Sequence, residues 1–120
     1  EENAATIKRI FDSTGYLIDT HTGVAATVYE AYRAESGDRA KTVIASTASP
    51  YKFSDSVMEA IAGPESIRDK DGFEVVDALN SLSGVDVPAA VEEIRHAPIR
   101  HNTECDVDKM EEAVKAILGI

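Results

Sequence analysis

The sequence predicts an α/β fold: a partial three-layer αβα unit with two short parallel strands, followed by a helical C-terminal tail. Two short apolar runs, residues 16–18 and residues 42–46, are typical of buried strands because they are continuous rather than alternating. Segments with helical spacing separate and follow these runs, and each run leads through a polar loop into a helix. After residue 63 only helical spacing remains, which predicts the tail.

The first predicted helix covers residues 2–14 and has one apolar face. The residues of that face recur at i, i+3 and i+4, and they are Ile7, Ile10 and Phe11. Gly15 is expected to end the helix, because glycine readily adopts the left-handed conformation of a C-cap. After the first strand and its polar loop, a second helix is predicted over residues 23–35, with the Thr22 hydroxyl as its N-cap and Gly37 as its end.

The second strand is followed by a third predicted helix, which has Ser54 as its N-cap and ends at Gly63. Three further helices are predicted in the tail, over residues 73–82, 88–96 and 106–118. The chain thus divides into residues 1–63, which hold both strands, and residues 64–120, a helical tail that packs on them. Two short strands do not make a stable sheet alone, so we expect residues 1–63 to belong to a larger α/β domain or to be completed by a partner.

The charge and composition of the chain limit the kinds of partner that it can bind. The chain has 120 residues, a formal net charge of -10 and 43% hydrophobic residues, which suits one soluble globular domain. Nucleic acid and anionic membrane surfaces are excluded as partners, because binding to them depends on clustered Lys and Arg. No apolar run approaches the ~20 residues of a transmembrane helix. The chain begins with Glu1 instead of Met and starts inside a helix, which favours a piece of a longer polypeptide.

The cysteine and histidine residues predict neither a disulfide nor a metal site. Cys105 is the single cysteine, which fits a reducing, cytoplasmic setting, and its acidic neighbours disfavour the reactive thiolate. His96 and His101 flank Pro98, so a shared helical face is disfavoured, and no histidine has the spacing of a metal ligand. His21 is the histidine that follows a predicted strand.

Polar side chains follow both predicted strands and form the candidate site. They are Asp19, Thr20, His21 and Thr22 after the first strand, and Ser46, Thr47 and Ser49 after the second. Because the carboxyl ends of neighbouring parallel strands meet at one sheet edge, we expect the two loops to lie side by side. A hydroxyl there can hydrogen-bond a heterocyclic nitrogen, whereas ordinary helix capping is the alternative interpretation of the same residues.

Two segments of the chain resemble motifs of the threonine synthase family. Residues 15–25 read GYLIDTHTGVA and resemble the family's G-Y-x-x-D-P-H-T-A-V-A segment. Residues 45–53 read ASTASPYKF and resemble its S-T-A-H-P-A-K-F segment. The motifs stand in the family's order and at about its separation, and the preceding stretch ATIKRIFDSTGYLID is also similar. The resemblance covers roughly the first 63 residues, while the remainder carries no motif.

The resemblance implies the C-terminal part of a pyridoxal-phosphate-dependent lyase of fold type II, which converts O-phosphohomoserine and water to threonine and phosphate. Residues 1–63 would then be the C-terminal part of the large domain that holds the cofactor. Thr47 would hydrogen-bond the pyridine nitrogen, with Ser46 adjacent, and this neutral hydroxyl would leave the nitrogen largely unprotonated. Asp19 and His21 match the loop that approaches the cofactor or the substrate.

The chain also departs from the family pattern. Thr20 stands where the family usually has Pro, Gly23 stands for Ala, and Ser49 stands for His. The lysine that forms the Schiff base lies upstream in the family, in a segment without a match here, and Lys52 matches a different lysine. Covalent attachment of the cofactor needs that activated amine. The isolated chain is therefore expected to have no catalysis and no tight cofactor binding.

Two other functions remain open from the sequence. One is a stand-alone acidic α/β module that works by protein interaction, with the motifs serving as helix caps. The other keeps the fold type II ancestry but carries out a different amino-acid lyase reaction. A chain separated from its parent domain also exposes apolar strand edges, here around Leu17, Ile18, Val43 and Ile44. Because exposed edges pair with other chains, we expect self-association, or tail helices that fold back over the gap.

Overall fold

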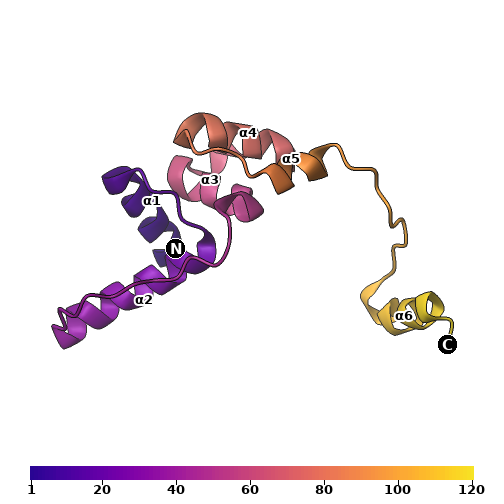
Figure 1. Ribbon diagram of the computed structural model, residues 1–120, viewed down its shortest axis with the longest axis horizontal. Helices are drawn as coiled ribbons and strands as arrows, with labels where there is room; N and C mark the ends of the chain where they lie inside the picture. Colours follow the sequence, from indigo (N-terminus) through magenta and orange to yellow (C-terminus); the bar gives the residue numbers. More distant parts are fainter.

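The computed structural model describes all 120 residues and is built from helices joined by turns and extended segments (Figure 1). The α-helices in chain order are α1 (Glu2–Thr14), α2 (Thr20–Ser36), α3 (Ser54–Ala62), α4 (Gly72–Ser83), α5 (Ala89–Arg95) and α6 (Met110–Leu118). The 3₁₀ turns are η1 (Pro50–Phe53), η2 (Pro64–Ser66) and η3 (Val107–Lys109). No residue lies in a β-strand, so the predicted α/β fold with two parallel strands is wrong.

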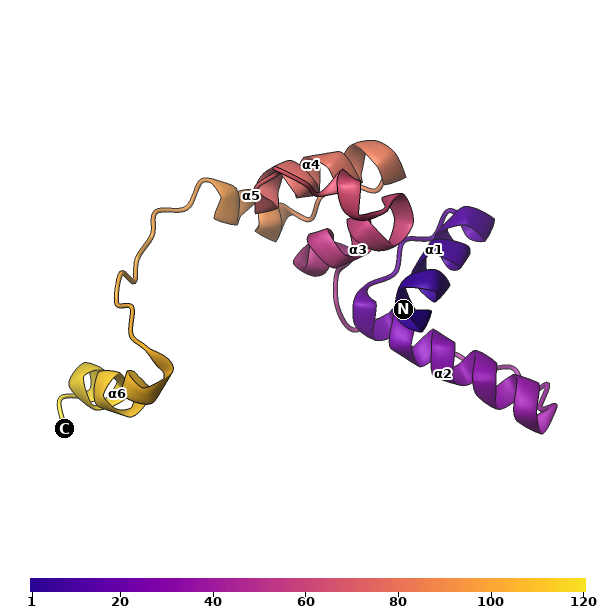
Figure 2. The ribbon, with the colours of Figure 1, turned by 180° about the vertical axis from the view of Figure 1, so that it is seen from behind.

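Both predicted strands are extended links without a strand partner. Residues 16–18 connect α1 to α2, and Leu17 and Ile18 are buried against helices instead of in a sheet. Residues 42–46 run back along α2 (Figures 1 and 2), and Val43 is 90% exposed. A strand is stabilised by a neighbour that pairs with its N–H and C=O groups, and neither segment has one. The exposed edges expected around Leu17 and Ile18 are therefore also absent.

The core lies where α1, α3 and α4 meet, since α3 packs on α1 on one side and on α4 on the other. Its members are Ile7, Leu17, Ile18, Tyr51, Val57, Met58, Ile61, Val75, Val76 and Leu79. The predicted apolar face of α1 contributes Ile7 to this core, and Ile10 and Phe11 pack against it. The core takes residues from both sides of Gly63, and the division of the chain at that residue stays a prediction.

The first turns of α2 pack closely against α1 at Gly23. A Cβ atom at this glycine would lie 2.2 Å from Asn3 Oδ1 and 2.8 Å from Ile7 Cγ1, so a larger residue requires these two side chains or the helices to shift. Asn3 Nδ2 donates a hydrogen bond of 3.1 Å to the carbonyl of Thr20, and this bond joins α1 to the start of α2. Asn3 Oδ1 is buried without a hydrogen-bond partner. Glycine at position 23 therefore sets the distance between the two helices.

Two predicted helix caps differ from those in the structure. Helix α2 begins earlier than predicted, at Thr20, because Asp19 and not Thr22 is its N-cap. Helix α3 begins at Ser54 itself, without a side-chain cap. The turn η1 precedes it, and Ser49 caps that turn by accepting a hydrogen bond of 3.2 Å from the backbone N–H of Tyr51. The predicted C-cap at Gly15 is confirmed, because its φ of 70° is left-handed.

Of the three C-terminal helices, α4 contributes to the core, whereas α5 and α6 have no buried residue. Helix α4 starts with a capping box formed by Asp71 and Glu74. Arg95 of α5 joins it to α4 through an ion pair with Asp77, in which Nη2 lies 2.6 Å from Oδ1. Figures 1 and 2 show α6 set apart from the other helices at the end of an extended segment. No residue of α6 is buried, and no helix is both long and apolar enough to cross a lipid bilayer.

Candidate functional site

The buried carboxylate of Asp19 forms the centre of the candidate site. Asp19 is 0% exposed and lies at the N-terminus of α2, where the first backbone N–H groups lack helical partners. Its Oδ1 accepts hydrogen bonds from the backbone N–H of His21 at 2.8 Å and of Thr22 at 3.4 Å. An Asp one residue before a helix is strongly favoured for this reason, and the positive end of the helix dipole also stabilises its charge.

Ser46 joins this cluster from a segment that is distant in the sequence. The hydroxyl oxygens of Thr22 and Ser46 are 3.0 Å apart. The Ser46 hydroxyl donates to Asp19 Oδ2 at 3.5 Å, and the Thr22 hydroxyl donates to the same oxygen. The return of residues 42–46 along α2 therefore brings Ser46 to the helix N-terminus. We call Asp19, His21, Thr22 and Ser46 the Asp19 cluster.

The hydrogen bonds of the Asp19 cluster keep its carboxylate charged. Burial raises the pKa of Asp19 when taken alone, because it removes water from the charge. Hydrogen bonds from the Thr22 hydroxyl, from the backbone N–H groups of His21 and Thr22, and from the His21 ring act in the opposite direction and lower the pKa below its ordinary value. The site thus holds a buried anion that only accepts hydrogen bonds.

The His21 ring connects the Asp19 cluster to η1. Its Nδ1 lies 3.2 Å from Asp19 Oδ1, and since a carboxylate only accepts, Nδ1 carries the hydrogen and donates it. The ring centroid is 4.9 Å from that of Phe53, with an angle of 54° between the planes. On the same aromatic ring, Lys52 places its Nζ 5.5 Å from the centroid. The imidazole remains 65% exposed, so its Nε2 edge is accessible to a ligand.

Of the four residues that the resemblance assigned to the cofactor site, three lie together in the structure: Asp19, His21 and Ser46. Thr47 follows Ser46 directly, is exposed, and has no hydrogen bond from its hydroxyl within the chain. The two polar loops do lie side by side, but they meet at the N-terminus of α2 and not at a sheet edge. The role of each residue toward a ligand stays a prediction.

One residue of the site has a larger part than the sequence indicated, and another was not predicted at all. Thr22 stood among the polar residues after the first predicted strand and as a candidate N-cap, and in the structure its hydroxyl bridges Asp19 and Ser46. Phe53 contacts the His21 ring, although no pattern distinguished it from a core residue. The spacing from Asp19 to Thr22 was a usable signal, because an N-cap side chain faces the residue three positions later. The contact of Phe53 depends on tertiary packing, which no local pattern reports.

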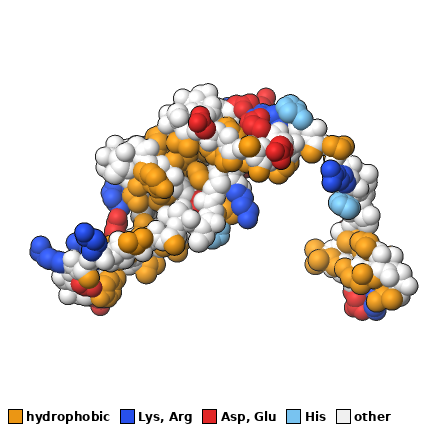
Figure 3. All heavy atoms as spheres, viewed as in Figure 1, with side chains coloured by type: hydrophobic (Ala, Val, Ile, Leu, Met, Phe, Trp, Pro, Cys, Tyr) orange, Lys and Arg blue, Asp and Glu red, His pale blue; other side chains and the backbone are white.

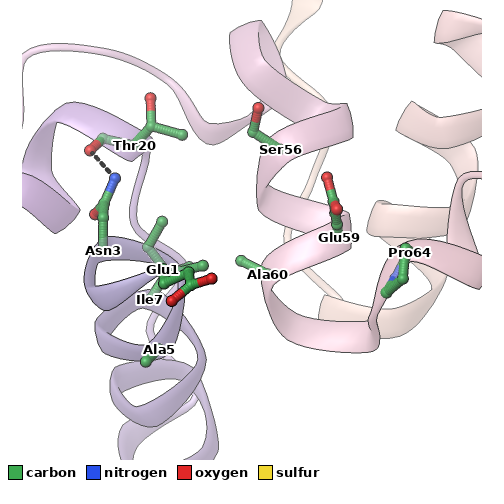
Figure 4. A pocket seen from close by; sticks show the side chains of 10 residues that line it. Glu1, Asn3, Ala5, Ile7, Thr20, Ser56, Glu59, Ala60 and Pro64 are labelled. Atoms are coloured by element: carbon green, nitrogen blue, oxygen red, sulfur yellow. Dashed lines mark hydrogen bonds between the residues drawn. The ribbon is translucent and has the colours of Figure 1, made fainter.

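A separate cleft of about 490 Å³ lies between α1, the start of α2 and α3 (Figure 4). It is lined by Glu1, Asn3, Ala4, Ala5, Ile7, Thr20, Ser56, Glu59, Ala60 and Pro64. Figure 4 shows Glu1 on the α1 wall and Glu59 on the α3 wall. Because two carboxylates repel an anionic ligand, this cleft does not suit a phosphate-bearing cofactor or substrate.

One residue, Thr47, has the chemistry that would suit one end of a pyridoxal phosphate molecule. A pyridine nitrogen accepts one hydrogen bond, and the unpaired Thr47 hydroxyl is a donor beside the Asp19 cluster. Ser46 is less free, because its hydroxyl already contacts Asp19 and Thr22. No glycine-rich loop for the cofactor phosphate occurs in the sequence. No group of three or more His, Cys, Asp or Glu side chains converges in a way that would hold a metal ion.

Comparison with known proteins gives two matches. The family model described as threonine synthase, C-terminal, matches residues 22–118. A threonine synthase from Saccharomyces cerevisiae is 38% identical over 68 residues, which is 52% of this chain and 13% of that protein. The chain thus corresponds to a small part of the length of this relative. The range matched by the family model includes Ser46, Thr47, Lys52 and Phe53.

Proposed function

Since the chain belongs to the threonine synthase family, as its C-terminal region, we propose that it forms part of the pyridoxal phosphate site of such an enzyme. The whole protein would be a cytoplasmic lyase that converts O-phosphohomoserine and water to threonine and phosphate. This chain would be a fragment of it and inactive alone, because the Schiff-base lysine and the loop for the cofactor phosphate lie elsewhere.

The observation that carries the proposal is the free Thr47 hydroxyl directly after the hydrogen-bonded Asp19 cluster. Ser46 is held by Asp19 and Thr22, which fixes the backbone just before Thr47. The Thr47 side chain is exposed and has no internal partner, so it is free to donate to a ligand. Helix capping explains why Asp19 is present, but it does not explain the Thr47 hydroxyl, which caps no helix.

The residues have separate tasks in this proposal. Pyridoxal phosphate, when bound, supplies an electron sink for chemistry at the amino-acid substrate. Thr47 donates a hydrogen bond to the pyridine nitrogen and, as a neutral group, leaves this nitrogen largely unprotonated. Asp19 does not contact the cofactor, since its oxygens are occupied by Thr22, His21 and Ser46. It acts as a positioning residue that holds Ser46 and the His21 ring.

The test uses the whole protein that contains this chain, as wild type, as Thr47→Val and as Thr42→Val. Valine keeps the shape of threonine but removes the hydroxyl, and Thr42 is an exposed threonine of the same segment that serves as the control. We expect a visible absorption band with pyridoxal phosphate and phosphate release from O-phosphohomoserine in wild type and in Thr42→Val. Thr47→Val should shift the band and lower kcat by about tenfold or more, the effect of losing one hydrogen bond to a charged or polarised group.

Each other outcome has a definite meaning. A band without phosphate release retains cofactor binding but rejects the substrate, which leaves a different amino-acid lyase reaction. No band in wild type rejects the cofactor and the enzyme proposal together, and leaves a module that works by protein interaction. Equal spectra and equal kcat in Thr47→Val and Thr42→Val contradict the role of Thr47.

A further inference from the structure

We propose that the Lys52 ammonium binds the phosphate group of the substrate, a phosphate monoester, and so distinguishes this substrate from one without phosphate. The inference rests on the proposed function but concerns a residue that the cofactor does not require. Lys52 lies in η1, one residue before Phe53. Nothing in the resemblance assigned it a role beyond excluding it as the Schiff-base lysine.

Lys52 is an unpaired cation in a strongly acidic chain. Its side chain is exposed, and its Nζ forms no ion pair and no hydrogen bond. Most other cations of the helices pair with carboxylates, as Lys8 does with Asp12 at 3.1 Å. The chain has 22 acidic and 12 basic residues, so most of its surface repels a phosphate ester. An unpaired ammonium is the group that such an ester would bind.

A series of contacts ties Lys52 to the Asp19 cluster. Its Nζ lies 5.5 Å from the Phe53 centroid, a cation–π distance that favours one side-chain orientation. The Phe53 ring in turn contacts the His21 ring at 4.9 Å, and His21 donates to Asp19. The ammonium therefore lies over the Phe53 ring, which also contacts the His21 ring of the Asp19 cluster.

The charge of a phosphate ester suits this position. A phosphate monoester carries about -1.5 to -2 charges near pH 7, and a lysine ammonium offers three donors to its oxygens. Solvent access at the exposed His21 and Lys52 side chains leaves room for the group. The acidic cleft between α1 and α3, with Glu1 and Glu59, would repel it. Of these two surfaces, the one at Lys52 therefore suits a phosphate ester better than the acidic cleft does.

The test again uses the whole protein, now as wild type, Lys52→Met, Lys52→Arg and the control Lys41→Met. Methionine keeps an unbranched side chain but removes the charge, and Lys41 is an exposed lysine of the same chain that, unlike Lys52, has no cation–π contact with Phe53. For Lys52→Met we expect KM for O-phosphohomoserine and the inhibition constant of inorganic phosphate to rise roughly ten- to hundredfold. Lys52→Arg should stay within a few-fold of wild type. The visible absorption of bound cofactor should not change in any variant.

The controls separate the possible sources of phosphate. If Lys52→Met instead weakens the affinity for pyridoxal phosphate and leaves KM unchanged, Lys52 binds the cofactor phosphate and the proposal is overturned. Equal KM and equal phosphate inhibition in Lys52→Met and Lys41→Met also overturn it, since Lys52 is then an ordinary surface lysine.

Failure of the proposed function is distinguishable from failure of this inference. If wild type releases no phosphate from O-phosphohomoserine, the proposed function fails, and calorimetric titration with inorganic phosphate decides about Lys52. Binding that is about tenfold or more weaker in Lys52→Met than in Lys41→Met supports the phosphate site. Equal binding in the two variants, or no binding by wild type, overturns it.

Discussion

At the scale of single residues, Asp19 shows how local chemistry builds the site. An isolated buried carboxylate is costly, but Asp19 accepts hydrogen bonds from two backbone N–H groups and from the hydroxyls of Thr22 and Ser46. These bonds make the charged form favourable inside the protein. Through Oδ1 the Asp19 carboxylate caps α2, and through Oδ2 it binds Ser46 of the segment that returns along α2.

The lowered pKa of Asp19 predicts how stability depends on pH. The pKa of Asp19 is lower in the folded state than its unfolded value of about 3.9. The Asp19 carboxylate therefore adds its full share to the free energy of unfolding above about pH 3.9, and this share is lost as the pH falls through the folded pKa. Asp19→Asn should lower the free energy of unfolding by about 1–3 kcal/mol at pH 7. In urea unfolding, this difference from wild type should stay constant from pH 7 to about 5 and shrink as the pH is lowered further to about 3.

The control for this prediction is Asp12→Asn, which removes an exposed carboxylate of α1 that pairs with Lys8. A surface pair contributes little, so this variant should stay within about 1 kcal/mol of wild type at pH 7. A difference between wild type and Asp19→Asn that stays constant over the pH range would mean that the charge of Asp19 does not stabilise the fold.

The sequence predicted the polar residues of the site, but it did not predict which residue of another element packs against them. Asp19, His21 and Ser46 were selected because polar residues at the ends of apolar runs often bind ligands, and they do lie together. Phe53 was not selected, because its contact with His21 arises from the position of η1 relative to α2. A partner that comes from another element leaves no trace in the local pattern.

At the scale of elements, the helices follow their local signals and the predicted strands do not. Helix α1 has the predicted bounds, because an apolar face and a glycine C-cap act within a few residues of each other. Residues 42–46 had an apolar, β-branched run as their signal. Such a run becomes a strand when another segment pairs with it, and here the segment lies along α2 instead.

The close approach of α1 and α2 predicts that Gly23→Ala is destabilising. An added Cβ meets Asn3 Oδ1 and Ile7 Cγ1 at 2.2 and 2.8 Å, and this overlap should cost about 1–3 kcal/mol of unfolding free energy. Alanine favours a helix interior by about 1 kcal/mol over glycine, so the overlap must outweigh that gain. Thermal unfolding should show a lower Tm for Gly23→Ala than for wild type.

Gly72→Ala is the matched control, because a Cβ at the first residue of α4 meets nothing within 4 Å. Its Tm should equal or slightly exceed that of wild type. The double variant Asn3→Ala with Gly23→Ala should lose less than the sum of the single changes, since the nearest obstacle is removed. A Tm of Gly23→Ala at or above wild type would show that α1 and α2 are not held this closely.

At the scale of the whole molecule, the chain leaves large apolar surfaces uncovered. Its extents are 58 × 33 × 26 Å, and α6 stands apart with hydrophobic side chains in view (Figure 3). The apolar face of η3 and α6 comprises Val107, Met110, Val114, Ile117 and Leu118, all exposed. On α2, the side chains of Val24, Val28 and Tyr32 are exposed at helical spacing. Exposed apolar faces of this kind associate with other surfaces.

The isolated chain is therefore predicted to self-associate through α6. Light scattering at micromolar concentration should give a mass above the 12.9 kDa of one chain. Ile117→Glu places a charge on the apolar face and should return the mass to that of a monomer. Lys115→Gln changes the net charge by the same amount on a residue that pairs with Glu111, and should leave the association intact. A monomeric wild type, or equal masses for both variants, contradicts this prediction.

The central claim of the account is the proposed hydrogen bond from Thr47 to the pyridine nitrogen of the cofactor, and it can be tested directly. Pyridoxal phosphate labelled with ¹⁵N at the pyridine nitrogen, bound to the whole protein, reports this contact by NMR. The account predicts the chemical shift of an unprotonated nitrogen that accepts a hydrogen bond, a clear change of that shift in Thr47→Val, and none in Thr42→Val. A protonated nitrogen, or a shift that is the same in wild type and Thr47→Val, would contradict the proposed site.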